Sequence, residues 1–173
     1  MGLLTGRAAL LMSLLSAAAA AWAAEPLELA VKAAYLAKFP YYVEWPAAAF
    51  SGPNSPLVIC VSGDDPIGTM VEDAVAGQQV QGHPLAVRRV RNVAREAGCH
   101  VAYVGEGRPD ALRGSSALVV ADAPASGATI TFVLKDNRVR FTVDDELAAQ
   151  SSLVISSKLL SVALAVKPRG SPR

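Results

Sequence analysis

The sequence lacks the features of several large classes of protein. Its 173 residues carry a formal net charge of +1, and nothing in it resembles the basic stripe that nucleic-acid binding needs. After residue 24 no apolar run reaches the length of about 18 residues that suggests a membrane-spanning helix, so we expect no transmembrane segment there. There are only two cysteines and two histidines, without a Cys-x-x-Cys spacing, and no metal site is predicted.

The motifs of common enzyme families are also missing. The sequence contains no Gly-x-Ser-x-Gly elbow and no phosphate-binding Gly-x-x-x-x-Gly-Lys loop, and Gly105-Glu106-Gly107 lacks the third glycine of a dinucleotide loop. Asp144 and Asp145 could be paired carboxylates, but a helix is expected to begin there, which favours N-capping. His83 and His100 have no acidic residue beside them and are interpreted as structural. We therefore predict no catalytic residue, no enzyme activity and no cofactor.

The first 23 residues have the composition of a cleaved export signal. Arg7 precedes an almost wholly apolar segment, 8–21, and Ala21-Trp22-Ala23 places small residues where a signal peptidase cleaves. The apolar segment is short and rich in alanine, which favours a cleaved signal over the alternative of an uncleaved anchor. We expect an exported protein with one domain over 24–167 and a disordered tail over 168–173.

Short apolar runs alternate with helical patterns along the chain. Apolar residues recur at spacings of three and four over 27–38, which predicts a helix that Pro40 interrupts. Helical patterns also cover 64–77, 108–114, 145–150 and 156–167, and strand patterns cover 56–63, 83–90, 99–105, 116–124 and the two arms of a hairpin within 128–144. This order predicts a single α/β domain: a mostly parallel sheet of about five or six strands, a hairpin in the C-terminal half, and helices on both faces.

Aromatic residues are few, yet most of them gather in one stretch near the start of the expected domain. The stretch contains Tyr35, Phe39, Tyr41, Tyr42, Trp45 and Phe50. A helix laid on a sheet buries aromatic rings, which assigns Phe39 and Trp45 to the structural core. Tyr35, Tyr41 and Tyr42 lie off the apolar stripe, and tyrosine is enriched in binding surfaces. We expect these three tyrosines to form part of a partner-binding surface.

Cys60 and Cys99 are the only cysteines. In an exported protein they indicate a single structural disulfide, which would close a loop of about 40 residues and stabilise the fold by roughly 4 kcal/mol. Zinc binding together with His83 and His100 is the alternative, and the ligand spacing disfavours it.

Seven segments occur in an order that resembles a known family. They are VKAAYLAKFPYYVEWP, LVICVSGDDPIG, VQGHPLAVRRV, CHVAYVG, ALVVADAP, VRFTVD and LVISSKLLSVALAV, and they span 31–166. The opening AAYL…F…VEWP together with the closing ISSKLL is the most specific part. On these segments the sequence resembles the YfiR-like family of bacterial periplasmic proteins.

The resemblance implies a mixed α/β fold and a regulator without enzyme activity. Such a regulator binds the periplasmic part of an inner-membrane diguanylate cyclase and restrains it, which controls cyclic di-GMP and biofilm formation, and an outer-membrane lipoprotein can sequester it. The resemblance also implies a homodimer and a bridge like that between Cys60 and Cys99, whereas the second cysteine pair of the best-known member is absent here. The alternative function is a periplasmic small-molecule receptor of a sensor or transport system, with a pocket at the strand ends.

Overall fold

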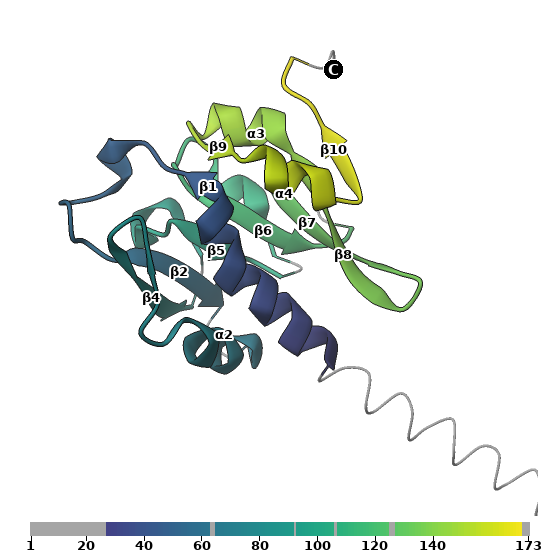
Figure 1. The fold of residues 1–173 in the computed structure, drawn as a ribbon, viewed down its shortest axis with the longest axis horizontal. Coiled ribbons are helices and arrows are strands. Elements are labelled where there is room, and N and C mark those ends of the chain that lie inside the picture. Colours follow the sequence, from purple (N-terminus) through teal and green to yellow (C-terminus); the bar gives the residue numbers. More distant parts are fainter. Residues whose placement is uncertain (1–26, 63–64, 92, 106, 125–126, 171–173) are drawn as a thin grey trace, which may run out of the picture.

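A computed structural model describes residues 27–62, 65–91, 93–105, 107–124 and 127–170 (Figure 1). The predicted export signal, residues 1–23, and the last three residues lie outside the described residues. Within the described residues, a central sheet with helices packed against it forms the α/β domain that the sequence predicts.

Eight strands form the central sheet. In spatial order they are β10 (Ala165–Lys167), β8 (Arg138–Asp144), β7 (Ile130–Lys135), β6 (Leu118–Asp122), β5 (Val101–Tyr103), β2 (Leu57–Ser62), β4 (His83–Val90) and β3 (Gln79–Val80). The pairs β7–β8 and β3–β4 are antiparallel, and the other neighbouring pairs are parallel. The largely parallel sheet and the hairpin β7–β8 confirm the prediction. The edge strands β3 and β10 are additions that the sequence patterns do not predict.

The central strands form where apolar side chains can be buried on both faces of the sheet. Successive residues of a strand point to opposite faces. In β6, Leu118 and Val120 belong to the larger of two buried clusters, and Val119 and Ala121 belong to the smaller one. A continuous apolar run is therefore what a central parallel strand requires.

The α-helices of the described residues each bury at least one side chain in the larger cluster. They are the helical residues 27–38, α2 (Ile67–Val75), α3 (Asp145–Gln150) and α4 (Ser157–Val162). In Figure 1 the N-terminal helix, in dark purple and blue, crosses in front of the sheet. On the other face the 3-10 helix η4 (Pro109–Leu112) buries Leu112 in the smaller cluster.

The aromatic stretch changes conformation after Lys38. The 3-10 helix η1 (Phe39–Tyr42) follows the helix, because Pro40 has no backbone N–H with which to continue it. The strand β1 (Val43–Glu44) then pairs antiparallel with β9 (Val154–Ile155), and the 3-10 helix η2 (Ala47–Ala49) comes next. This two-stranded sheet joins the stretch to the C-terminal segment.

The predicted C-terminal helix over 156–167 is wrong in its second half. Helix α4 ends at Val162, Ala163 is extended with φ −66° and ψ 147°, and β10 runs parallel to β8. The Leu164 N–H donates to the Phe141 carbonyl at 2.8 Å. The open edge of β8 thus satisfies backbone groups that local helical spacing assigns to a helix.

The predicted disulfide is present. It joins Cys60 in β2 to Cys99, with Cα atoms 5.6 Å apart. The next residue, His100, donates its backbone N–H to the carbonyl of Val58 at 2.8 Å. The bridge therefore ties β2 to the start of β5, two neighbouring strands of the sheet.

Candidate interaction groove beside the aromatic stretch

An apolar groove runs between the N-terminal helix and α4. Its volume is about 730 Å³. The residues that line it come from three segments: Ala30, Val31, Ala34, Tyr35, Lys38, Phe39, Tyr42, Phe141, Lys158, Leu159, Ser161 and Val162. Two of these segments, the aromatic stretch and α4, lie at opposite ends of the domain sequence, and the pairing of β1 with β9 brings them together.

The floor of the groove belongs to a set of four packed rings, which we call the phenyl cluster: Tyr35, Phe39, Phe132 and Phe141. The ring of Tyr35 stacks on Phe39 at 5.7 Å between centroids and meets Phe141 edge-on at 5.3 Å. Phe39 is 1% exposed and also packs edge-on against Phe141 at 5.3 Å. These offset and edge-on arrangements are the favourable geometries for aromatic rings, so the floor is held rigidly.

The rim of the groove is exposed and carries charge of one sign. Tyr42 is 38% exposed and Val162 is 57% exposed, so apolar surface faces solvent on both sides. The charged residues in the lining are Lys38 and Lys158, and the lining contains no acidic residue. An exposed apolar groove with a polar, positively charged rim is a candidate interaction site.

The structure brings two of the three predicted surface tyrosines into this groove. Tyr42 and the half-buried Tyr35 line it, whereas Tyr41 points elsewhere and donates its hydroxyl to the Gln78 side chain at 2.7 Å. The ammonium of Lys38 lies over the Tyr41 ring, 5.2 Å from its centroid. The wall that α4 supplies was not predicted from the sequence. Its signal was the pattern SKLLSV, in which Leu159 is buried and Val162 is not.

A family model described as YfiR/HmsC-like matches residues 29–164, which include every residue that lines the groove. The chain belongs to the YfiR/HmsC-like family. The match confirms the resemblance that the sequence segments indicate. No curated protein matches the chain.

A second set of rings in this YfiR/HmsC-like chain lies beyond β1, and we call it the histidine cluster: Trp45, Phe50, His83 and His100. Phe50 stacks between the two imidazoles, at 3.8 Å from His83 and 4.5 Å from His100. Trp45 is 9% exposed, and its indole N–H donates to the His100 carbonyl at 3.2 Å. These contacts fix the loop that follows the aromatic stretch.

His100 is neutral in this arrangement. Its Nδ1 accepts from the Val58 N–H at 3.1 Å, so the ring proton lies on Nε2, which donates to the Ala49 carbonyl at 3.1 Å. Burial is the main cause that lowers the pKa of His100, and the charges of His83 and Arg88 lower it further against the opposing bond to Ala49. Both ring nitrogens are thus used in structure, as the sequence analysis expects of a structural histidine.

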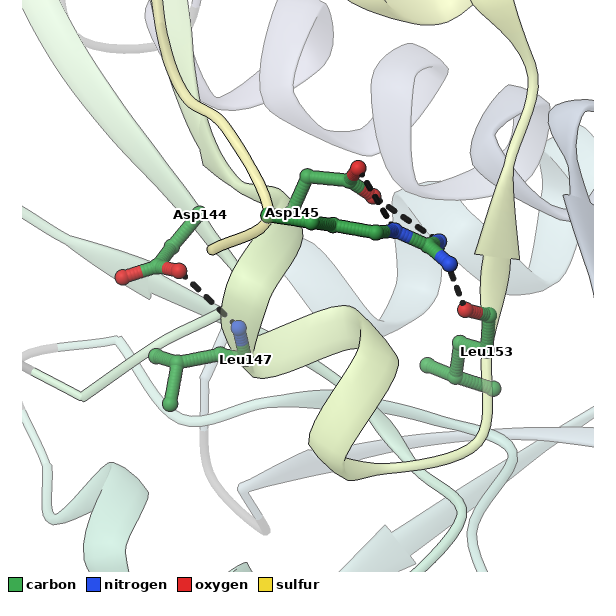
Figure 2. Close-up of polar contacts among 5 residues, drawn as sticks. Asp144, Asp145, Leu147 and Leu153 are labelled. Carbon is green, nitrogen blue, oxygen red and sulfur yellow. Dashed lines mark hydrogen bonds and ion pairs between the residues drawn. The ribbon is translucent and has the colours of Figure 1, made fainter. Parts of the chain in front are cut away.

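Asp144 and Asp145 have separate structural roles (Figure 2). The Asp144 carboxylate caps α3 (Asp145–Gln150) by accepting from the Leu147 N–H at 2.9 Å. Asp145 accepts from Arg169 through both carboxylate oxygens, at 2.8 and 3.1 Å, and Arg169 also donates to the Leu153 carbonyl. The two carboxylates therefore do not face one reaction site. Arg169 is anchored although the sequence analysis places it in the tail.

The carboxyl ends of β5 and β6 hold an ion pair. Lys32 on the N-terminal helix bonds Asp122 at 2.9 Å and Glu28 at 2.8 Å. Burial acts to lower the pKa of Lys32, but the hydrogen bonds to Glu28 and Asp122 outweigh it and raise that pKa. Tyr103 donates its hydroxyl to Asp122 at 2.6 Å, and burial together with this bond raises its pKa. This network attaches the helix to the strand ends where the receptor alternative places a ligand.

The described residues contain neither a metal-binding cluster nor a membrane-spanning helix. No group of three or more His, Cys, Asp or Glu side chains in the described ranges could hold a metal ion. Over the same part of the chain, no helix is long and apolar enough to cross a membrane.

Proposed function

We propose that this protein is a periplasmic regulator without enzyme activity, which binds and restrains the periplasmic part of an inner-membrane signalling protein. The partner is a diguanylate cyclase, so the protein limits cyclic di-GMP and biofilm formation. Membership of the YfiR/HmsC-like family supports this assignment. The observation that carries it here is the apolar groove with its exposed Tyr42 and Val162.

The groove fits a protein partner because its walls are helices. It lies between the N-terminal helix and α4, and a partner helix can lay an apolar face between two such walls. Lys38 and Lys158 favour acidic side chains beside that face. Exposed anchors such as Tyr42 would supply most of the binding energy.

Three polar side chains that could be candidates for catalysis make structural contacts instead, which supports a role other than catalysis. Asp144 is a helix cap, Asp145 is paired with Arg169, and His100 uses both ring nitrogens in hydrogen bonds. A general base needs a free lone pair facing a substrate.

Val162→Asp tests the proposed binding site. Val162 is 57% exposed, so the change should leave thermal unfolding nearly unaltered while it places a charge in the groove. We expect binding to the purified periplasmic part of a cyclase encoded beside this gene to weaken at least tenfold, or about 1.4 kcal/mol. In cells, cyclic di-GMP should rise.

The matched control is Val154→Asp, because Val154 is 48% exposed on β9 and does not line the groove. Equal loss of binding in both variants would contradict the proposed site.

The same two variants test the expected homodimer, whose mass can be measured by sedimentation. If Val162→Asp yields a monomer and leaves cyclase binding intact, the groove is a subunit interface instead.

A polar recess favours the small-molecule receptor as a second candidate function. It has a volume of about 380 Å³ and is lined by Arg113, Thr129, Asp144, Glu146 and Lys167 among others. Lys167 bonds Glu146 at 2.6 Å and Asp144 at 3.3 Å, and these bonds raise the pKa of Lys167. A thermal-shift screen of small polar metabolites tests this function, and a hit should be lost in Thr129→Val.

A further inference from the structure

The end of the hairpin β7–β8 projects beyond its neighbours. β7 pairs with β6 only over Ile130–Phe132, and β8 pairs with β10 only over Thr142–Asp144. Residues 133–135 of β7 and 138–140 of β8 pair only with each other, across the hairpin. Three residues of each arm therefore extend about 10 Å past the sheet. Figure 1 shows this end in green, away from the helices.

One face of the projecting end carries three basic side chains. Lys135 lies directly opposite Arg138, and Arg140 follows two residues later on the same face of β8. All three are exposed, and no ion pair of theirs is found among the described residues. Like charges placed directly opposite each other destabilise a hairpin. An external anion would remove this cost.

The hairpin does not need these charges in order to form. Asp136 and Asn137 have φ of 52° and 56°, which is the tight turn that matches the twist of two strands. Lys135, Asp136, Arg138, Arg140 and Leu164 surround a shallow recess of about 260 Å³. With one acid against three bases, this recess is suited to an anion such as a phosphate group.

The opposite face of the same end is apolar. Leu134 is 60% exposed and lies opposite Val139, so a large aliphatic side chain faces solvent on the other face of the hairpin from the three basic residues. Basic residues next to exposed aliphatic ones are typical of segments that lie at a membrane surface, where the cations meet lipid phosphates and the aliphatic side chain enters the interface.

We propose that the end of hairpin β7–β8 binds an anionic phospholipid surface through Lys135, Arg138 and Arg140, with Leu134 entering the interface. Contact with the membrane would hold the protein close to membrane-embedded partners. The proposal rests on the hairpin alone and is independent of the groove.

Vesicle sedimentation tests this proposal with the purified protein. The probes are vesicles of phosphatidylcholine alone and vesicles with roughly one third phosphatidylglycerol. The protein should bind the anionic vesicles, and the binding should weaken as salt rises from about 50 to 150 mM. In Arg138→Gln/Arg140→Gln the binding constant should fall roughly 25-fold, since each basic residue near such a surface contributes about fivefold. Leu134→Ser should cause a smaller loss.

The matched control is Arg91→Gln/Arg108→Gln, which changes the net charge equally at two exposed arginines elsewhere. This control should bind as the unaltered protein does, and both double variants should unfold at the same temperature. Equal binding to neutral vesicles, no binding to anionic ones, or an equal loss in the control would overturn the proposal. Displacement by free inorganic phosphate at constant ionic strength would also overturn it, because the recess would then be a site for a soluble anion.

Discussion

The two ring clusters on either side of the exposed tyrosines are built on different physical principles. The phenyl cluster of Tyr35, Phe39, Phe132 and Phe141 is held by ring packing, with five ring pairs whose centroids are 5.3–5.9 Å apart. The histidine cluster adds hydrogen bonds from Trp45 and His100 to backbone groups. The contribution of the phenyl cluster to the free energy of unfolding should not depend on pH, whereas that of the histidine cluster should.

The largest expected effect comes from Phe39→Ala, which breaks the phenyl cluster. Phe39 is 1% exposed and contacts three other rings, so its removal leaves a cavity beneath the groove. We expect a loss of about 3–5 kcal/mol in the free energy of unfolding, measured by urea denaturation. The loss should be the same at pH 5.5 and pH 7.5. A loss below about 1 kcal/mol would show that the cluster is loosely packed.

Cys60→Ser should have the next largest effect, and it acts on the histidine cluster. The bridge to Cys99 fixes the residue before His100, so its loss frees the strand that carries the imidazole. We expect a loss of roughly 2–5 kcal/mol in the free energy of unfolding. The unaltered protein, unfolded without reductant, should show no free thiol on titration. Two free thiols would contradict the bridge.

Much of this arrangement could be predicted from the sequence, because it depends on local patterns. The helix over 27–38, the break at Pro40 and the six inner strands follow from spacing, turn residues and β-branched runs. The groove could not be predicted, because its second wall is α4, far along the chain. Its position follows from the pairing of Val43 with Ile155, and strands of two residues are too short for a sequence pattern to predict.

Tyr35 shows how a contact between distant segments changes a local interpretation. On an isolated helix it lies off the apolar stripe, which suggests exposure. In the structure, Phe132 and Phe141 from the hairpin widen the apolar surface that the helix meets, and Tyr35 becomes half-buried. The strand β10 could not be predicted either, because it forms only by pairing with the open edge of β8, a contact between distant segments.

Acidification should cause a smaller loss of folding stability, and this loss should come from the histidine cluster. The pKa of His100 is lowered from its ordinary value of 6.5, so the unfolded chain binds a proton more readily than the folded one. The stability contribution is complete above pH 6.5 and is lost as pH falls below it. A protonated Nδ1 cannot accept from the Val58 N–H.

His100→Gln measures this effect. Urea denaturation between pH 7.5 and pH 5 should show the unaltered protein losing on the order of 1 kcal/mol more than the variant, which is the contribution of one hydrogen bond. His83→Gln serves as the matched control, because Nδ1 of His83 contacts the Ser55 carbonyl and has no backbone N–H to accept. Parallel pH profiles for the unaltered protein and His100→Gln would contradict this assignment.

The smallest effect on stability should come from the tyrosines between the two clusters. Tyr41 and Tyr42 are 42% and 38% exposed, so changing both to alanine should alter the free energy of unfolding by no more than about 0.5 kcal/mol. Binding to the periplasmic part of the proposed partner should weaken at least tenfold, as expected for the loss of an aromatic anchor.

The single variants Tyr41→Ala and Tyr42→Ala separate the contributions of the two rings to partner binding. Tyr42→Ala should account for most of the loss because Tyr42 lines the groove, whereas Tyr41 bonds Gln78 outside it. If Tyr41→Ala weakens binding more than Tyr42→Ala, the partner contacts the surface near Gln78 and not the groove. If the double variant unfolds as readily as Phe39→Ala, both rings belong to the core.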